Sequence, residues 1–164
     1  MNIADLILML KATSLSEATR GYAWAWPICE MLHFVGLSLL LGTIGLLDLR
    51  LLGFMKGIPI TALRALLPYG IAGFVINAVT GVIFFIAAPD QYIYNVAFYY
   101  KLAFLVIAGG NALFFETKHG HRLIGIEGGA ATPTAFRIAG VVSLVSWFMV
   151  LYWGRMLPFV GNAF

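Results

Sequence analysis

Four long apolar stretches separated by short polar segments dominate the chain. They cover about residues 26–47, 65–88, 97–115 and 137–156, and each approaches the roughly 20 residues with which a helix crosses a bilayer. Lipid offers the backbone no hydrogen-bond partner, so we expect each stretch to be helical. The pattern predicts an all-α membrane protein, in which residues 1–164 form a single domain built as a bundle of four transmembrane helices.

A short segment with helical features precedes the first apolar stretch. The sequence Ser-Leu-Ser-Glu at 14–17 has the spacing of a capping box, which predicts a helix start at Ser14. Residues 1–21 lack a basic N-terminal region, carry Asp5 early and contain too short an apolar run for a secretory signal peptide. We therefore expect a short N-terminal helix at the membrane interface.

Small and polar residues recur at helical spacing within each apolar stretch. In the first stretch, Cys29, His33, Gly36, Leu40 and Thr43 share one helix face. The corresponding positions are Gly70, Gly73, Asn77 and Thr80 in the second stretch, Gly109, Gly110 and Asn111 in the third, and Gly140, Ser143 and Trp147 in the fourth. Membrane helices associate through close backbone packing and interhelical hydrogen bonds, so these faces are expected at the bundle centre. Asn77 and Asn111 both fall near mid-membrane, where we expect them to bond to each other.

Composition supports the membrane assignment, and the charges indicate an orientation. Hydrophobic residues make up 62% of the chain and charged residues 10%, which excludes a water-soluble globular domain. Of the ten basic residues, six lie in the segments after the first and third stretches and four on the opposite side. Because basic residues accumulate on the cytoplasmic side, this bias predicts that both termini lie outside. No basic block alternates with aromatic residues, so no nucleic-acid partner is expected.

Four ionisable residues are expected at one level in the outer half of the membrane. Glu30 and His33 lie one turn apart in the first stretch, the third stretch carries Lys101 near its start, and the fourth ends with Arg155. A charge within a span is costly unless it is paired, and it marks a functional site by default. We therefore expect the four side chains to converge in a buried site.

A second set of charges marks the inner ends of the same stretches. Its members are Asp48, Arg50, Arg64, Glu116 and His119. We interpret them as ordinary charges at helix ends. Both Glu30–His33 and Glu116–His119 have the Glu-x-x-His spacing of di-iron bundles, but they fall at opposite membrane ends, which excludes a shared metal site. His119 and His121 are interpreted as a surface pair without a metal.

Short motifs are spaced along nearly the whole chain. They are Pro27-x-x-Glu30-x-x-His33, Asp48-Leu49-Arg50-Leu51-Leu52-Gly53, Leu66-Leu67-Pro68, Gly73-Phe74, Thr80-Gly81, Tyr99 to Lys101, Gly110-Asn111 and Gly154-Arg155. This set resembles a family of uncharacterised bacterial four-helix integral membrane proteins, loosely copper-resistance-D-like. The resemblance implies the fold and no activity. With the charge distribution, it implies a bacterial inner membrane location with both termini on the periplasmic side.

A b-type haem is the first candidate ligand of the outer site. His33 is expected to be its axial ligand, with Glu30 orienting the imidazole. Gly36, one turn further on, would leave room for the macrocycle, and Lys101 and Arg155 would neutralise the propionates. Such a protein would pass electrons rather than transform a small molecule. No second histidine lies within a stretch, so the other ligand would be a methionine, the His33 of a neighbouring subunit, or absent.

Three other functions are compatible with these residues. Copper(I) favours soft ligands such as Cys29, Met31 and His33, although Met31 points away from the shared face. Alternatively, Glu30 and His33 titrate within a path for a small ion or an anion, or the charges fix helix register in an accessory subunit of a larger membrane complex. No nucleophile lies beside a base, so we expect neither a hydrolase nor a transferase.

A second small-residue stripe on the first stretch bears on oligomerisation. Ser38, Gly42 and Gly45 lie about 140° around the helix from His33, at 3.6 residues per turn. The stripe is expected to pack against the second helix or against another protomer, since small residues let helix backbones approach in lipid. We expect a homo-oligomer, most simply a dimer.

Overall fold

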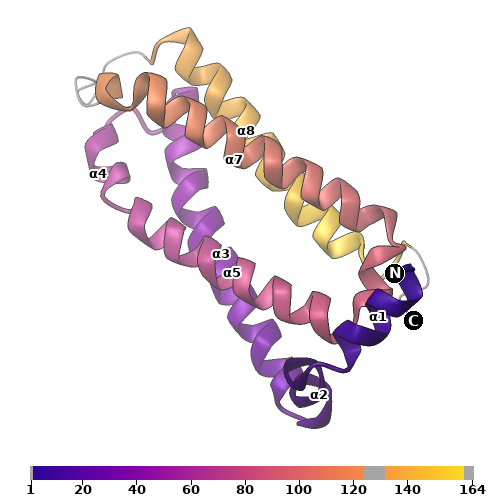
Figure 1. The fold of residues 1–164 in the computed structure, drawn as a ribbon. Helices are drawn as coiled ribbons and strands as arrows, with labels where there is room; N and C mark the ends of the chain where they lie inside the picture. Colours follow the sequence, from indigo (N-terminus) through magenta and orange to yellow (C-terminus); the bar gives the residue numbers. More distant parts are fainter. Residues whose placement is uncertain (1, 124–131, 161–164) are drawn as a thin grey trace.

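The described part of the chain folds into α-helices. The structure is a computed structural model that describes residues 2–123 and 132–160, and no strand occurs in these two ranges. The helices are α1 (Ile3–Lys11), α2 (Ser14–Gly21), α3 (Ala25–Leu52), α4 (Ile60–Arg64), α5 (Leu67–Ala87), α6 (Pro89–Ile93), α7 (Val96–Leu123) and α8 (Thr134–Met156). Four segments are long and apolar enough to cross a bilayer (Figure 1). The predicted fold class, an all-α membrane protein, is confirmed.

The first spanning helix extends further than the apolar pattern suggests. The sequence places the end of the first span near residue 47, whereas α3 continues to Leu52. It ends where Gly53 adopts the left-handed conformation with φ of 100°, which favours glycine. Asp48 and Arg50 therefore lie within the helix. The other spanning segments are Ile60–Ala87, Val96–Lys118 and Thr134–Met156.

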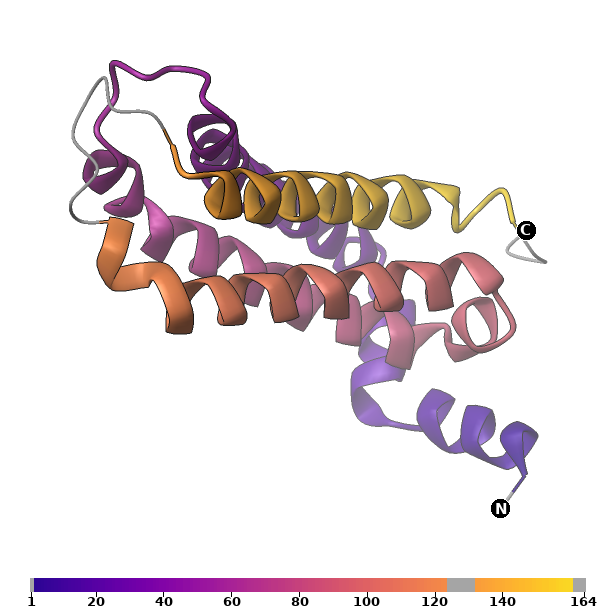
Figure 2. The ribbon, with the colours of Figure 1, turned by 90° about the horizontal axis from the view of Figure 1, so that it is seen from above.

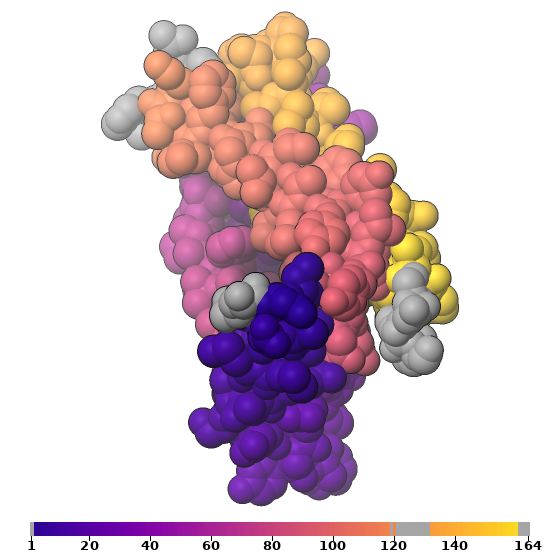
Figure 3. All heavy atoms as spheres, turned by 45° about the vertical axis from the view of Figure 1, so that its right-hand side comes forward, coloured from indigo at the N-terminus to yellow at the C-terminus, as the bar shows by residue number. Residues whose placement is uncertain are grey.

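Two short helices precede the first span, where the sequence predicted one. The Thr13 hydroxyl, and not that of Ser14, caps α2 by accepting a hydrogen bond from the Ser16 N–H at 3.3 Å. The predicted helix start at Ser14 is therefore correct, but its capping residue is wrong. Asp90 at the start of α6 pairs with Lys11 at 2.9 Å, which fastens α1 over α5 and α6 (Figure 3).

The four spanning helices form an open bundle. Helix α3 packs against α5 and α8, and α7 packs against α8, whereas α5 and α7 do not pack together along their lengths (Figures 1 and 2). The end at which α3 begins and α8 finishes is named the His33 end. The opposite end, where α3 finishes and α8 begins, is named the Asp48 end. Side chains that extend from α7 toward α5 therefore lie between the α3–α5 pair and the α7–α8 pair.

Two glycines let α3 and α5 cross at very short distance. A Cβ atom on Gly73 would lie 2.5 Å from the Gly36 carbonyl oxygen and 2.7 Å from the Leu40 nitrogen. Real Cβ atoms do not approach backbone atoms so closely, so only glycine fits at this crossing. The crossing fixes which residues of α3 and α5 face each other on the His33 side of it.

Three of the four predicted interior faces are confirmed. On α3, α5 and α8, the predicted residues are buried or half-buried. On α7, Gly109 and Gly110 are exposed, and a Cβ on either would meet nothing within 4 Å. That prediction is wrong because α7 packs mainly against one neighbour, α8. It buries Ala97, Ala108 and Phe115 instead.

The predicted hydrogen bond between Asn77 and Asn111 is absent. The Asn77 side-chain N–H donates to the Gly73 carbonyl of its own helix at 3.0 Å. The Asn111 side-chain N–H donates to the Ala139 carbonyl of α8 at 3.1 Å. Since α5 and α7 do not pack together, each amide satisfies its donor on the nearest helix backbone.

The apolar core is concentrated away from the His33 end. Among the described residues, one buried cluster closes the Asp48 end and consists of Leu47, Leu51, Ile60, Leu63, Phe115 and Phe136. A second cluster lies further along the bundle and consists of Leu40, Ala108, Trp147 and Val150. The His33 end is lined instead by polar and aromatic side chains, which makes it the better place for a site.

Candidate functional site

His33 reaches across the α3–α5 interface to Thr80. Its Nδ1 atom lies 2.7 Å from the Thr80 hydroxyl oxygen, and its ring meets Phe84 edge-on with 5.8 Å between ring centroids. One turn earlier, the Cys29 thiol lies 3.8 Å from the Thr80 carbonyl oxygen and donates to it. The sequence placed Cys29 and His33 on one face, and this is confirmed. The role of Thr80 as their common partner was missed.

The Thr80 hydroxyl lies between the His33 ring and the backbone of its own helix. Its oxygen is 2.7 Å from the Ile76 carbonyl and 3.2 Å from the Asn77 carbonyl, either of which can accept its single hydrogen. In the Nδ1–H tautomer of the neutral His33 ring, the hydroxyl then accepts from Nδ1–H and Nε2 keeps its lone pair. Metal-ligating histidines have the same arrangement, because a hydrogen bond to one ring nitrogen orients the other. Among the hydrogen bonds of the described residues, none uses Nε2.

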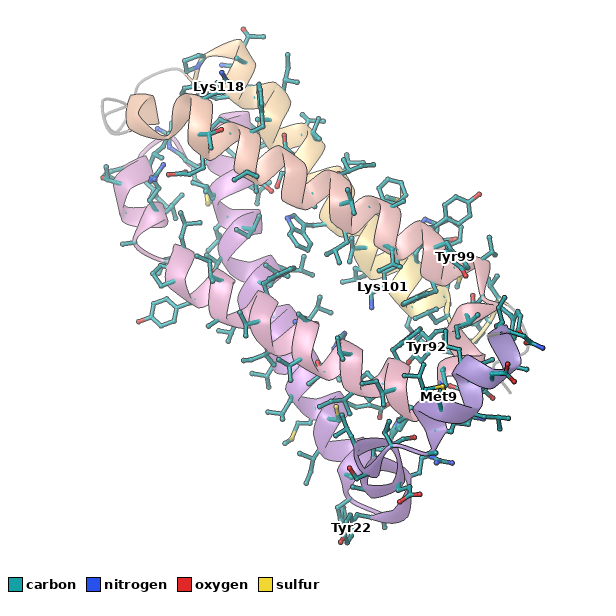
Figure 4. All side chains as sticks on the ribbon, in the orientation of Figure 1. Met9, Tyr22, Tyr92, Tyr99, Lys101 and Lys118 are labelled. Carbon is teal, nitrogen blue, oxygen red and sulfur yellow. The ribbon has the colours of Figure 1, made fainter. Side chains whose placement is uncertain are left out.

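Lys101 brings a positive charge to the same end of the bundle. Its side chain extends from α7 along Gly154 of α8, where a Cβ would lie 3.7 Å from the ammonium nitrogen. It points into the space between α7 and α5 (Figure 4). The Lys101 ammonium lies within electrostatic reach of the His33 ring. Lys101 forms no ion pair with any carboxylate of the described residues.

The other two charged residues of the predicted site lie outside it. Glu30 is exposed, and its carboxylate accepts a hydrogen bond from the Trp26 indole N–H at 3.2 Å. Arg155 is also exposed, with its guanidinium 4.9 Å from the centre of the Phe159 ring. The prediction of one buried site containing all four side chains is therefore wrong for Glu30 and Arg155. Spacing in sequence placed them at the correct level, but each has a partner on its own side of the bundle.

The room expected beside Gly36 is filled by α5. A Cβ on Gly36 would lie 2.6 Å from the Asn77 side-chain nitrogen and 2.8 Å from the Gly73 carbonyl oxygen. The expectation that Gly36 leaves space for a macrocycle is corrected accordingly, because this glycine serves the helix crossing. Any large ligand of His33 has to lie on the side facing α7 and α8.

Tyr92 of α6 lies beside the same region. Burial raises its pKa to about 12, and the negative charge of Glu30 and the Cys29 thiol add to the effect. Its ring contacts Phe85 and Phe98, with 6.1 Å and 5.3 Å between ring centroids. Tyr92 is a neutral phenol within electrostatic reach of the start of α3.

The Asp48 end differs from its sequence interpretation. Asp48 and Arg50 are buried, with 3% and 0% of their surfaces exposed, so they are not ordinary helix-end charges. Arg50 donates to the Ile58 carbonyl at 2.8 Å and to the Thr132 hydroxyl at 3.3 Å, which ties together two connecting segments. Arg64 and Glu116 fit the interpretation better, since they form a partly exposed ion pair of 2.6 Å.

A signal in the sequence could have identified Asp48. At 3.6 residues per turn, Asp48 lies about 60° around α3 from His33, on the interior side, whereas Arg50 lies about 100° away in the other direction. The apolar pattern ends before these residues and so does not include Asp48 in the helix. Ser143 of α8, predicted to face the bundle centre, contacts the Asp48 carboxyl as a hydrogen-bond donor.

The described residues contain no cluster of three or more metal-ligating carboxylate, thiol or imidazole groups. His33 therefore stands as a single potential ligand, beside the Cys29 thiol that bonds to Thr80. The predicted loop pair, His119 and His121, has side chains outside the described part of the structure.

Comparison with known proteins identifies a family for the chain. No curated protein and no solved structure matches the sequence. A family model, described as a family of unknown function (DUF6644), matches residues 15–160, from α2 to beyond the end of α8. The match includes His33, Thr80, Lys101 and Asp48. The chain therefore belongs to this family of unknown function, DUF6644.

Proposed function

We propose that the protein is a membrane electron-transfer protein that holds a haem b through His33. The observation that carries the proposal is the His33 ring, whose Nδ1–H is fixed by Thr80 at 2.7 Å while Nε2 keeps a free lone pair. An imidazole held in this way is prepared to ligate iron through Nε2. A haem supplies one-electron chemistry when it is bound.

Of the residues present, His33 would supply one ligand of the haem iron and Lys101 one cation for a propionate. Lys101 offers an unpaired cation, among the described residues, in the space between α7 and α5. At this end Phe85 of α5 stacks on Phe98 of α7, with 5.7 Å between ring centroids. Aromatic rings from α5, α6 and α7 border this end. Glu30, Gly36 and Arg155 have no part in the proposal. The four spanning segments, as the structure describes them, supply no second histidine.

Copper is less well supported than haem. Met31, which would complete a soft ligand set with Cys29 and His33, is 58% exposed. The Cys29 thiol bonds to the Thr80 carbonyl at 3.8 Å and so already has a partner. A Cu(I) site needs ligands that converge on one point, and these three do not.

We further place the protein in a bacterial inner membrane with both termini on the periplasmic side. The four spanning segments support a multi-pass membrane protein. The distribution of six basic residues against four supports the orientation. In this orientation the His33 end lies in the periplasmic half of the membrane. Cysteine labelling from outside tests this placement, since a cysteine at exposed Gln91 should react and one at exposed Lys56 should not.

A second copy of the chain is the proposed partner. A Cβ atom added to Gly42 or Gly45 would have nothing within 4 Å, so the small-residue stripe does not pack against α5. Ser38, which begins the stripe, also lines a shallow groove on α3 together with Glu30 and Phe34. Small residues exposed to lipid permit close helix packing between protomers. Replacement of Gly42 by Leu should shift the protein to monomer in native mass spectrometry.

The visible absorption spectrum of the protein purified from haem-replete cells tests the proposed function. The wild-type protein should show a Soret band, which His33→Ala abolishes. The double variant His119→Ala/His121→Ala is the matched control and should keep the band, because these are the remaining histidines of the chain. Lys101→Ala should retain less haem through purification with the ligand bond intact. A colourless wild-type protein would exclude the haem.

Transport of a small anion is the second candidate. It is favoured by one observation, the Lys101 ammonium without a counter-charge among the described residues. Proteoliposomes loaded with chloride distinguish the two functions. An anion flux that is lost in Lys101→Ala, and kept in the exposed control Lys56→Ala, would support transport. Absence of flux with a haem present would exclude it.

A further inference from the structure

A buried carboxyl group at the Asp48 end has no role in the proposed haem site. Asp48 is 3% exposed, and its Oδ2 atom has no hydrogen-bond partner in the described structure. Helix α8 lies close to α3 at this position, since a Cβ on Gly140 would lie 3.2 Å from the backbone carbonyl oxygen of Asp48. Ser143 on α8 lies within hydrogen-bonding reach of the carboxyl.

The charged groups around Asp48 are directed elsewhere. Buried Arg50 on the same helix donates to Ile58 and Thr132, while within the described ranges its Nη2 atom has no hydrogen-bond partner and forms no ion pair with Asp48. From α4 and α7, Arg64 and Glu116 pair with each other at 2.6 Å. Arg137, at the start of α8, is exposed. Asp48 therefore has no cation partner among the described residues, and neither salt bridge of these residues includes it.

An ionised carboxylate in this position would be a full charge without compensation in an apolar core. Such burial is strongly unfavourable, whereas the neutral acid carries only a hydroxyl dipole. An apolar side chain of similar size would satisfy the helix crossing better than either form. An ionisable group retained at this depth points to a function that uses its proton.

We propose that Asp48 is a proton-binding site, neutral at rest, which exchanges its proton with water at the Asp48 end. Its O–H bond breaks to give the carboxylate and a hydrated proton, and re-forms on uptake. The route is short, because α3 ends four residues later, about 6 Å along the helix axis at 1.5 Å per residue. Ser143 and Ser146, both buried and one turn apart on α8, continue a line of hydroxyl groups toward the bundle middle. The inference does not depend on haem binding.

Infrared spectroscopy of aspartate-labelled protein tests this proposal. The chain has three aspartates, Asp5, Asp48 and Asp90. In the double variant Asp5→Asn/Asp90→Asn, a ¹³C label on the aspartate carboxyl therefore reports Asp48 alone. We expect the carbonyl band of a protonated acid in proteoliposomes at neutral pH. It should convert reversibly to the carboxylate bands when the pH is raised, and Ser143→Ala should move the midpoint to higher pH because a donor to the carboxylate is lost.

Three outcomes would overturn the proposal. A carboxylate at neutral pH would show that Asp48 is charged at rest. A protonated band that persists at every pH at which the protein stays folded would show a locked structural acid. A titration midpoint that is the same in Ser143→Ala as in the parent protein would show that the exchanging carboxyl does not lie beside Ser143. The measurement uses a label at native Asp48, so it does not depend on the folding of an Asp48 variant. Asp48→Asn serves only to assign the band, which it should remove.

Discussion

The two ends of α3 hold their polar groups in different ways. At the His33 end, the imidazole is half-buried and has a hydroxyl partner on α5 at 2.7 Å, and aromatic rings of α5, α6 and α7 lie at the same end. At the Asp48 end, the carboxyl is almost fully buried under α8 beside an apolar cluster, with one oxygen unsatisfied. The first arrangement holds a ring through a hydrogen bond to a neighbouring helix, and the second confines a carboxyl within the bundle.

The closeness of the helix crossings also differs between the two ends. The α3–α5 crossing at Gly36 and Gly73 brings backbones together beside His33, and the two helices stay in contact toward the His33 end through His33–Thr80 and Trp26–Phe84 (Figure 1). At Gly140 the approach of α8 to α3 is looser, with 3.1 Å to the Leu51 Cβ where the shortest distance at Gly73 is 2.5 Å. Asp48 is nevertheless the more deeply buried of the two groups, with 3% of its surface exposed beside the apolar cluster of the Asp48 end.

The largest expected effect is at the α3–α5 crossing. Gly73→Ala should lower the free energy of unfolding by about 3 kcal/mol, because its methyl group would overlap backbone atoms of α3. Gly140→Ala should cost about 1 kcal/mol, because the Leu51 Cβ at 3.1 Å and the Asp48 backbone carbonyl oxygen at 3.2 Å leave a smaller overlap to relieve. Both are measured by unfolding in mixed micelles. Gly109→Ala, in open space on α7, is the control and should stabilise α7 by about 0.5–1 kcal/mol. Equal losses at Gly73 and Gly140 would contradict the comparison.

Arg50 should contribute more to stability than an exposed cation. Arg50→Ala removes two charge-assisted hydrogen bonds, to Ile58 and Thr132, and should lower the unfolding free energy by about 2 kcal/mol. Lys56→Ala, in the exposed connection after α3, should change it by less than about 0.5 kcal/mol. The same unfolding assay compares the two. A small effect of Arg50→Ala would mean that the Asp48 end is not closed by this guanidinium.

Loss of the Thr80 hydroxyl should release the His33 ring at a smaller cost. Thr80→Val removes the hydrogen bonds of the hydroxyl with His33 and with the Ile76 carbonyl and should lower the unfolding free energy by about 1 kcal/mol. Nitrogen NMR of labelled histidine should show the His33 ring change from the Nδ1–H form to a mixture of tautomers. Thr117→Val removes a hydroxyl that bonds only within α7 and should leave the His33 signals unchanged. Unchanged signals in Thr80→Val would separate Thr80 from the site.

The smallest expected effect is a pH dependence at the His33 end. The hydrogen bond from Lys11 is the main cause that lowers the pKa of Asp90. A lowered pKa in the folded state means that the ion pair stabilises α1 above the ordinary pKa of 3.8, and that this stability is lost as the pH falls through the folded value. Because the Asp90 side chain is 49% exposed, the contribution should stay below about 1 kcal/mol. The protection of α1 amides against hydrogen exchange should fall in acid, and Asp90→Asn should remove this pH dependence of the protection.

Several features follow from the sequence without knowledge of neighbours. The four spanning helices follow from apolar length, because lipid leaves the backbone only the helix for its own hydrogen bonds. The interior faces of α3, α5 and α8 follow from helical spacing of small and polar residues, which fixes angles within one helix. The same helical spacing places His33 and Cys29 on one face of α3. These predictions concern single helices, and they were confirmed.

Other features were decided only by the tertiary structure. The partners of Asn77 and Asn111, the outward positions of Glu30 and Arg155, and the burial of Asp48 depend on which helix lies beside each residue. Sequence spacing gives the depth and direction of a side chain but not the neighbour that it meets. That neighbour is set by the glycine contacts that fix how closely α3 approaches α5 and α8, and by the absence of packing between α5 and α7. Because these contacts join residues far apart in the chain, no periodicity within one helix encodes them.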